Sequence, residues 1–328
     1  MRRAFQVACL GVAVLSAPLH AQDVGRLYSQ SELASAGSRY APNLRGLWDE
    51  DFLTRLAPGE RQRAGKVTLL LPLMGARRSP LDFYSSPPER QVFLPIASVK
   101  FLDDMSIAIA YHESRGCGMG AVSDYVGLLR TQSSTMKGSP RDALGVPANA
   151  LGDKVVDDVS QKLLKSMVYF IVAHEFAHVM YQHKSYKTIG AQEAQRQEAE
   201  ADGFALEVMR RIAVPPLSMV HFFTLVSRLE TSPADFETLD QYEAFLRQGA
   251  THPVSAQRIF AVADALQVNV KAFAVLQSNP AQWEVRLLQA VRDLRAIGAT
   301  LDDRAMRQYL TYRAQTINPA SLRVACQQ

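Results

Sequence analysis

The sequence predicts an α+β protein that is mostly helical, with a small β-sheet packed against a long helix. Two observations predict this fold class. Three apolar runs rich in β-branched residues, 66–73, 91–101 and 105–111, are separated by Pro- and Ser-rich or acidic stretches, as strands usually are. From Asp153 onward the apolar residues instead recur every three or four positions, which is typical of helices.

The composition is that of an ordinary globular protein. Of the 328 residues, 48% are apolar and 21% are charged, which excludes a disordered, collagen-like or coiled-coil chain. The 36 basic and 32 acidic residues give a net charge of only +4, and the basic residues form no dense stripe. We therefore do not expect a nucleic acid as a partner.

The first 21 residues resemble a secretory signal peptide. Arg2 and Arg3 precede an apolar stretch over 4–19, and a small residue, Ala21, follows at the expected cleavage position. The alternative is an uncleaved membrane anchor, for which the stretch is short. No second stretch is long and apolar enough to cross a bilayer, so we expect a mature protein that is periplasmic or secreted, without a membrane span.

The cysteines predict one disulfide bond. Cys9 leaves with the signal peptide, so the mature chain keeps Cys117 and Cys326. An even pair in an oxidising compartment favours a bridge between them. Two unpaired thiols that lie far apart are the alternative.

The remaining elements follow in chain order. Residues 22–65 are mixed and polar, with a short helix expected over 49–56, and 131–152 has no apolar period and is expected to be a long surface loop. A long helix should follow Asp153, and Pro215 and Pro216 should end the next one. Beyond the long helix, we expect helices over 191–212, 217–229, 235–248, 253–267, 281–297 and 301–314.

His174-Glu175-Phe176-Ala177-His178 is a His-Glu-x-x-His sequence inside the long helix. Two histidines four positions apart share one helical face, so both imidazoles can bind one zinc ion. Glu175 would lie beside that ion and could take a proton from a metal-bound water. The alternative, two core histidines without a metal, would bury two polar rings beside a carboxylate with no evident partner, which is costly.

A catalytic zinc needs a third protein ligand and leaves one position for water. Tyr181 and Lys184 stand where a metzincin has a glycine and a histidine, which excludes that class. In the helix over 191–212, the apolar stripe runs back toward the N-terminus onto Asp202 and Glu198, so two acids share the face that should be buried. We expect Glu198 to be the third ligand.

Asp202 is one turn beyond Glu198, where it could accept a hydrogen bond from a ligand imidazole and fix its tautomer. Pairing with a buried arginine is the alternative. Glu200, between the two acids, is expected to be an ordinary surface acid. It shares the opposite, wettable face with Glu193, Arg196, Gln197, Glu207 and Arg211.

These motifs resemble the gluzincin metallopeptidases, and more narrowly the family that contains the CAAX prenyl protease, the heat-shock protease HtpX and soluble periplasmic quality-control peptidases. The resemblance rests on the His-Glu-x-x-His sequence and on Glu198-Ala-Glu-Ala-Asp202 twenty residues later. His183 and the downstream Thr251-His252-Pro253 and Arg258-Ile259 also match, over residues 100–260. The resemblance implies that the Glu of the Glu-x-x-x-Asp motif is a zinc ligand. It also implies that the run 105–111 is an edge strand that pairs with substrate, although an interior strand remains the alternative.

The sequence thus predicts an exported zinc endopeptidase with one Zn²⁺ per chain, acting on proteins or peptides, with a role in envelope quality control and peripheral envelope association as further expectations. His174, His178 and Glu198 would hold the metal and Glu175 would be the general base. His252 would either stabilise the oxyanion or close the site as a fourth ligand. The alternatives are a zinc-stabilised, non-proteolytic scaffold or chaperone-like factor, and a hydrolase of non-peptide substrates. The expected segments are a signal peptide (1–21), an N-terminal segment (22–65), a zinc metallopeptidase domain (66–260) and a C-terminal helical extension (261–328).

Overall fold

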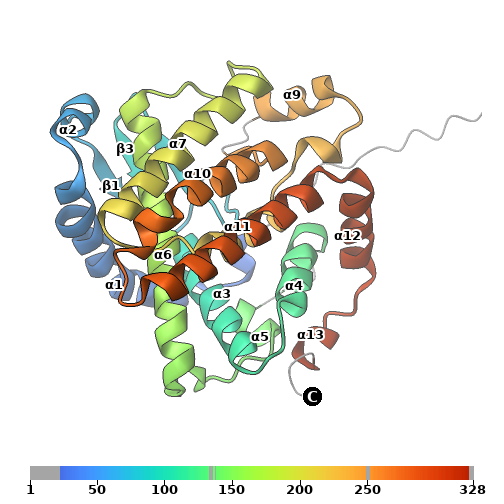
Figure 1. Ribbon diagram of the computed structural model, residues 1–328. Coiled ribbons are helices and arrows are strands. Elements are labelled where there is room, and N and C mark those ends of the chain that lie inside the picture. Colours follow the sequence, from blue (N-terminus) through green and yellow to red (C-terminus); the bar gives the residue numbers. More distant parts are fainter. Residues whose placement is uncertain (1–22, 133–135, 137, 249–251, 325–328) are drawn as a thin grey trace, which may run out of the picture.

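The computed structural model describes residues 23–132, 136, 138–248 and 252–324. The signal peptide over 1–21 and Cys326 therefore lie outside the described residues. Most of the described chain is helical, with one small sheet, as an α+β chain should be (Figure 1). The helices are α1 (Gln30–Gly46), α2 (Pro58–Ala64), α3 (Ile96–Ser114), α4 (Gly120–Thr131), α5 (Pro140–Ala143), α6 (Lys154–Tyr181), α7 (Ala191–Arg211), α8 (Ser218–Leu229), α9 (Leu239–Arg247), α10 (Ala256–Ala274), α11 (Pro280–Asp302), α12 (Arg304–Thr316) and α13 (Ser321–Val324).

Helix α6 runs through the middle of the molecule, and the other elements surround it (Figure 1). Its N-terminus is capped by Asp153, which accepts a hydrogen bond from the Val155 amide at 2.9 Å. It ends where Gln182 adopts the left-handed conformation, with φ of 56°. Contrary to the expectation from the sequence, a further stretch is long and apolar enough to span a membrane: among the described residues it is α6, and 89% of its most apolar stretch is buried within the protein. These features are those of a core helix.

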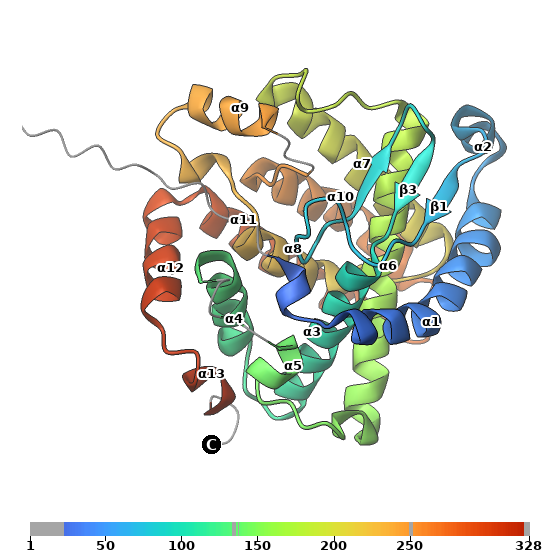
Figure 2. The ribbon, with the colours of Figure 1, turned by 180° about the vertical axis from the view of Figure 1, so that it is seen from behind.

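Three short strands form a sheet in the order β1-β3-β2 beside α6 (Figure 2). β1 (Thr68–Leu70) pairs in parallel with β3 (Gln91–Phe93), and β2 (Tyr84–Ser86) pairs with β3 in the antiparallel sense. Both β2 and β3 contact α6, so the sheet packs on the helix that carries the His-Glu-x-x-His sequence. β2 pairs on one side only and is an edge strand of the sheet.

The structure corrects the predicted strands. Residues 105–111 are not a strand but part of α3, which also takes the end of the predicted strand over 91–101. Helix α3 is buried on nearly every side, so its sequence lacks the alternation of apolar and polar residues that marks a surface helix. Asp103 and Asp104, which resemble a break in the sequence, are buried and bonded: Tyr28 donates to Asp104 at 2.8 Å and Arg39 pairs with Asp103 at 3.1 Å.

The sheet also contains a strand that the sequence does not indicate. β2 lies in the Pro- and Ser-rich stretch 75–90, which was expected to be only a connection. Its tyrosine ring stacks on Phe93 of β3, with the ring centroids 4.4 Å apart. That cross-strand contact stabilises a strand too short to show a period of its own.

The termini of the described chain are helical as well. α1 starts with a capping box formed by Ser29 and Glu32 and continues into a π-helical turn over Leu47–Phe52, so the helix expected over 49–56 is the end of a longer one. The expected loop over 131–152 contains α5 and a 3-10 turn. The helices predicted between 191 and 314 are present with shifted ends. The expected boundary after residue 260 falls inside α10.

Candidate metal centre

His174, Glu175 and His178 lie in the C-terminal half of α6, and all three side chains are buried. The two imidazoles come from adjacent turns of the helix, and their Nε2 atoms are 3.0 Å apart. Burial lowers the pKa of His178 to about 4, so this ring is neutral near pH 7. A neutral imidazole nitrogen is the form that binds a metal.

Glu198 reaches the same point from α7 and is completely buried. One carboxylate oxygen is 3.4 Å from Nε2 of His178, and the other is 3.6 Å from Nε2 of His174. Burial opposes ionisation of Glu198, but Arg258 and the neighbouring imidazoles outweigh it and hold its pKa well below the usual range. Glu198 is therefore a carboxylate, the form that can bind a cation. Its position agrees with the face argument from the sequence.

His252 approaches from the segment that precedes α10. Its Nδ1 atom is 3.3 Å from Nε2 of His174 and 3.3 Å from Oε1 of Glu198. Its Nε2 atom lies 3.1 Å from Oε1 of Glu175 and 3.1 Å from the carbonyl oxygen of Phe83. His252 thus contacts both the base expected from the sequence and the residue just before β2.

Together, these side chains fit a metal ion. The candidate ligand atoms of His174, His178, Glu198 and His252 all lie within 4.8 Å of one another. In a tetrahedral zinc site with bonds of about 2.0–2.2 Å, ligand atoms are about 3.3–3.6 Å apart. The separations given above, 3.0–3.6 Å, are close to this spacing. Glu175 and Glu198 outweigh burial and raise the pKa of His252 to about 10, so this ring must lose a proton before it can join His174, His178 and Glu198 in binding a divalent cation.

Glu175 lies beside this cluster without belonging to it. Its side chain is only 2% exposed, and its Oε2 atom has no hydrogen-bond partner among the described residues. Burial opposes ionisation of this group too, but the nearby His252, His174 and His178 lower its pKa to about 2. Glu175 is therefore ionised at neutral pH, and its unbonded oxygen is the atom that could accept a proton from a reacting group in the cluster.

Asp202, one turn after Glu198 on α7, makes both of the contacts considered from the sequence. It lies 2.8 Å from Nδ1 of His174, so it can accept a hydrogen bond that leaves Nε2 of the ring free for a metal. It also accepts from the buried Arg258 at 2.7 Å. Because Arg258 pairs with Glu198 as well, at 2.5 Å, one guanidinium from α10 fixes both acids of the motif.

A second set of contacts, which the sequence motifs did not indicate, lies on the opposite side of the cluster. Nδ1 of His183 is 2.8 Å from Nδ1 of His178, and its Nε2 is 3.2 Å from a carboxylate oxygen of Glu200. Glu200 is partly exposed, as expected of a surface acid, but its contact with His183 was not expected. Gln197, also expected on the wettable face, is buried and bonds to both backbone groups of Lys184. The helix face turns inward here because the α6–α7 loop packs over it.

Tyr186, in that loop, is a further contact that no sequence pattern indicates. Its buried hydroxyl donates a hydrogen bond to Oε1 of Glu198. Burial, with the Glu198 charge, raises the pKa of Tyr186 well above its ordinary value, so the phenol stays protonated. A neutral donor of this kind helps to orient a ligand carboxylate.

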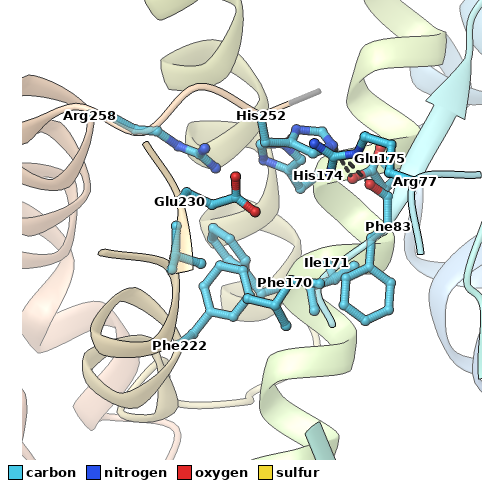
Figure 3. A pocket seen from close by; sticks show the side chains of 12 residues that line it. Arg77, Phe83, Phe170, Ile171, His174, Glu175, Phe222, Glu230, His252 and Arg258 are labelled. Carbon is cyan, nitrogen blue, oxygen red and sulfur yellow. Dashed lines mark hydrogen bonds and ion pairs between the residues drawn. The ribbon is translucent and has the colours of Figure 1, made fainter. Parts of the chain in front are cut away.

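Two hollows meet at His252. The first, with room for about 40 Å³, lies between the cluster and the apolar side chains of Phe170, Ile171 and Phe222 (Figure 3). The second, about 540 Å³, runs along β2 and the loop after α6, past His178. His252 lines both, so its side chain separates an aromatic pocket from an open groove.

Comparison with known proteins gives one match. Residues 142–277 match the model of the family described as Peptidase U49. The matched stretch contains His174, Glu175, His178, Glu198 and His252, the whole of the cluster and its neighbouring acid. No curated protein and no solved structure shows significant similarity to the chain. The match supports a peptidase that acts on protein substrates.

Proposed function

We propose that this protein is a zinc-dependent endopeptidase of the gluzincin type. The single observation that carries the proposal is the convergence of four potential ligand atoms beside the buried, partly unbonded carboxylate of Glu175. The peptidase family match covers this site. The resemblance to the CAAX prenyl protease and HtpX family supports the narrower assignment.

His174, His178 and Glu198 would hold the zinc ion, which when bound would polarise the scissile carbonyl and lower the pKa of a water. Glu175 would take the proton of the attacking water on its free oxygen and pass it to the departing amine. Asp202 would keep the His174 ring in the tautomer that presents Nε2. Arg258 would keep both acids of α7 ionised and in place.

The groove along β2 gives the proposal a place for substrate. β2 is an edge strand, and an extended peptide can pair with such an edge through its main chain, with little dependence on sequence. Residues 105–111, the edge strand expected from the sequence, belong to α3, so the substrate strand must pair elsewhere, and β2 is the edge that borders the cluster. The aromatic pocket beside Phe170 and Phe222 would receive an apolar side chain of the peptide.

We also propose that the protein is exported. The support is the order of charged, apolar and small residues over 1–21. A peptidase with an unselective groove would then act on envelope or secreted proteins, which fits a role in quality control. N-terminal sequencing of the protein recovered from the envelope should start at Gln22.

His252 bears on the main alternative, a zinc-stabilised scaffold that cuts nothing. Structural zinc sites fill all four positions with protein ligands, and His252 is within reach of the fourth. A purely structural site, however, has no use for a buried carboxylate such as Glu175 beside it. We therefore propose that His252 closes the zinc site at rest and moves away when a peptide binds.

Replacing His252 by Ala tests the closing role. We expect faster cleavage at unchanged zinc content, because the water position becomes permanently available. The measurement is the cleavage rate of unfolded casein against zinc content for the wild type and the variant. A slower rate at full zinc content would show instead that His252 stabilises the oxyanion.

The proposed function itself is tested by metal analysis and proteolysis of the purified mature protein. We expect about one zinc per chain, cleavage of casein that stops on removal of zinc with a chelator, and recovery when zinc is returned. Cleavage that continues in fully metal-free protein would refute the proposal. Bound zinc with no cleavage of any protein substrate would favour the scaffold or a non-peptide hydrolase.

A further inference from the structure

A second charged site lies away from the metal centre, between α4, α8 and α12. Each helix contributes one arginine: Arg130 from α4, Arg228 from α8 and Arg307 from α12. We call the small hollow between them the arginine pocket. Its wall is completed by Gly127, Thr131, Leu310, Thr311 and Ala314.

Arg228 is the unusual member of the arginine pocket. The residue is 8% exposed, and its guanidinium makes no hydrogen bond or ion pair with any described residue. Its Nε atom is fully buried without a partner. Buried charges in proteins are normally paired, because leaving one uncompensated is strongly destabilising.

The neighbouring acids are already engaged by other arginines. Asp235 pairs with both Arg130, at 3.0 Å, and Arg307. Asp124 pairs with Arg313 through both carboxylate oxygens, at 2.7 and 2.6 Å. Four arginines therefore face two aspartates. Glu230 adds a third negative charge that acts on Arg130 without forming an ion pair; its backbone carbonyl accepts from Arg307, and its side chain lines the aromatic pocket.

Loss of a proton does not remove the excess charge. Burial, together with the charges of Arg307, Arg130 and Arg313, outweighs the opposing charge of Asp124 and lowers the pKa of Arg228 to about 10. At neutral pH the guanidinium is still protonated. With Glu230 counted, four arginines and three acids leave an excess of one positive charge, and a water molecule could accept a hydrogen bond there but could not balance that charge.

The space in the pocket is small and depends on a glycine. The hollow has room for about 10 Å³, close to the volume that one water-sized guest requires. A Cβ atom at Gly127 would lie 3.0 Å from Cβ of Ala314 and 3.2 Å from Nη2 of Arg228. Glycine therefore allows α12 and the Arg228 side chain to come close to α4 while a guest site remains. Such a site suits a single-atom anion and is too small for phosphate.

We propose that the arginine pocket binds one chloride ion. The ion would accept hydrogen bonds from the Arg228 guanidinium and would offset the charge that Asp235 and Asp124 leave unbalanced. The three arginines come from α4, α8 and α12. Bound chloride would therefore stabilise the packing of α12 on α4 and α8. This inference does not depend on the proposed peptidase function.

The test is thermal unfolding of the full chain in sodium chloride and in sodium gluconate at equal ionic strength. Gluconate is too large for the pocket. We expect chloride to raise the Tm of the wild type by about 4 °C in a saturable manner, as binding to the folded state alone requires. Equal Tm values in the two salts at all concentrations would overturn the proposal.

Two variants make the test specific. Arg228→Met removes the unpaired charge and should abolish the difference between the salts. Arg295→Met, which removes an exposed guanidinium paired with Asp264, should leave it intact. A chloride effect of unchanged size in Arg228→Met would contradict the assignment. If Arg228→Met does not fold, anomalous scattering from bromide in wild-type crystals decides, since a bromide peak beside Arg228 supports the site and its absence refutes it.

Discussion

At the scale of single residues, the metal centre is held by contacts behind its ligands. Asp202 contacts His174 and His183 contacts His178. Arg258 and Tyr186 both contact Glu198. Each contact fixes either the tautomer of a ring or the orientation of a carboxylate. Partners of this kind normally change metal affinity about 10–100-fold when they are removed. The ligands alone therefore do not account for the geometry of the site.

Substitutions of three acids of α7 test whether the ligands and the residues behind them affect zinc binding to different extents. Glu198→Ala should leave no bound zinc after dialysis, because it removes a ligand. Glu200→Ala should keep zinc but bind it about tenfold more weakly, because His183 loses its acceptor and no longer orients His178. Glu193→Ala is the control, since that side chain bonds only to the exposed Arg196.

The measurement is zinc content, followed by competition with a chelator. A Glu198→Ala protein that retains one tightly bound zinc would rule out the ligand assignment. Equal affinity in the Glu193 and Glu200 variants would show that the contact from His183 to Glu200 does not matter.

The sequence was sufficient to predict the candidate ligands on α6 and α7, because four-residue spacing and a helical face are local properties. The contacts of His183, Tyr186 and Glu200 could not be predicted, because they depend on how the α6–α7 loop folds back. In the sequence, only the short Arg258-Ile259 signature indicated Arg258. Its pairing with Glu198 and Asp202 requires α10 to pack on α7, which no local pattern reports.

At the scale of elements, the observed helices and strands differ from the predicted ones where burial removes the alternation of apolar and polar residues. α3 is enclosed on almost all sides, so its apolar run is compatible with either a strand or a helix, and only tertiary packing decides. β2 has three residues and is fixed by pairing with β3. The start of α10, by contrast, is determined by a local contact. Ser255 accepts a hydrogen bond from the Arg258 amide, and this cap sets the start of the helix and the direction of the Arg258 side chain.

Arg258→Met tests how strongly α10 is tied to α7. We expect the metal-free protein to lose about 3–5 kcal/mol of unfolding free energy, because two buried carboxylates lose their shared counter-ion. Arg295→Met is the matched control, since its ion pair with Asp264 is exposed and should contribute about 1 kcal/mol or less. Urea unfolding measures both. A loss below 1 kcal/mol for Arg258→Met would mean that the buried network is not what holds the two helices together.

At the scale of the whole molecule, α6 is enclosed by helices from several parts of the chain, with α3 and α7 packed most extensively on it. α1 packs on α3, while α10 and α11 lie against each other beyond α7. The described chain ends beside α5, where the backbone of Arg323 lies close to Gly145. Cys326 lies just past that point, outside the described residues, so the bridge to Cys117 stays a prediction. Non-reduced peptide mapping of the exported protein should recover the two cysteines in one linked peptide.

In the proposed zinc peptidase, Glu175 acts as the general base. Replacing it by Gln keeps the size of the side chain but removes the proton acceptor. The most direct test compares wild type and Glu175→Gln for zinc content, unfolding temperature and casein cleavage in the same preparation conditions. We expect one zinc and an intact fold in both, with cleavage at least about 10²-fold slower in the variant. Undiminished cleavage by zinc-loaded Glu175→Gln would contradict the account.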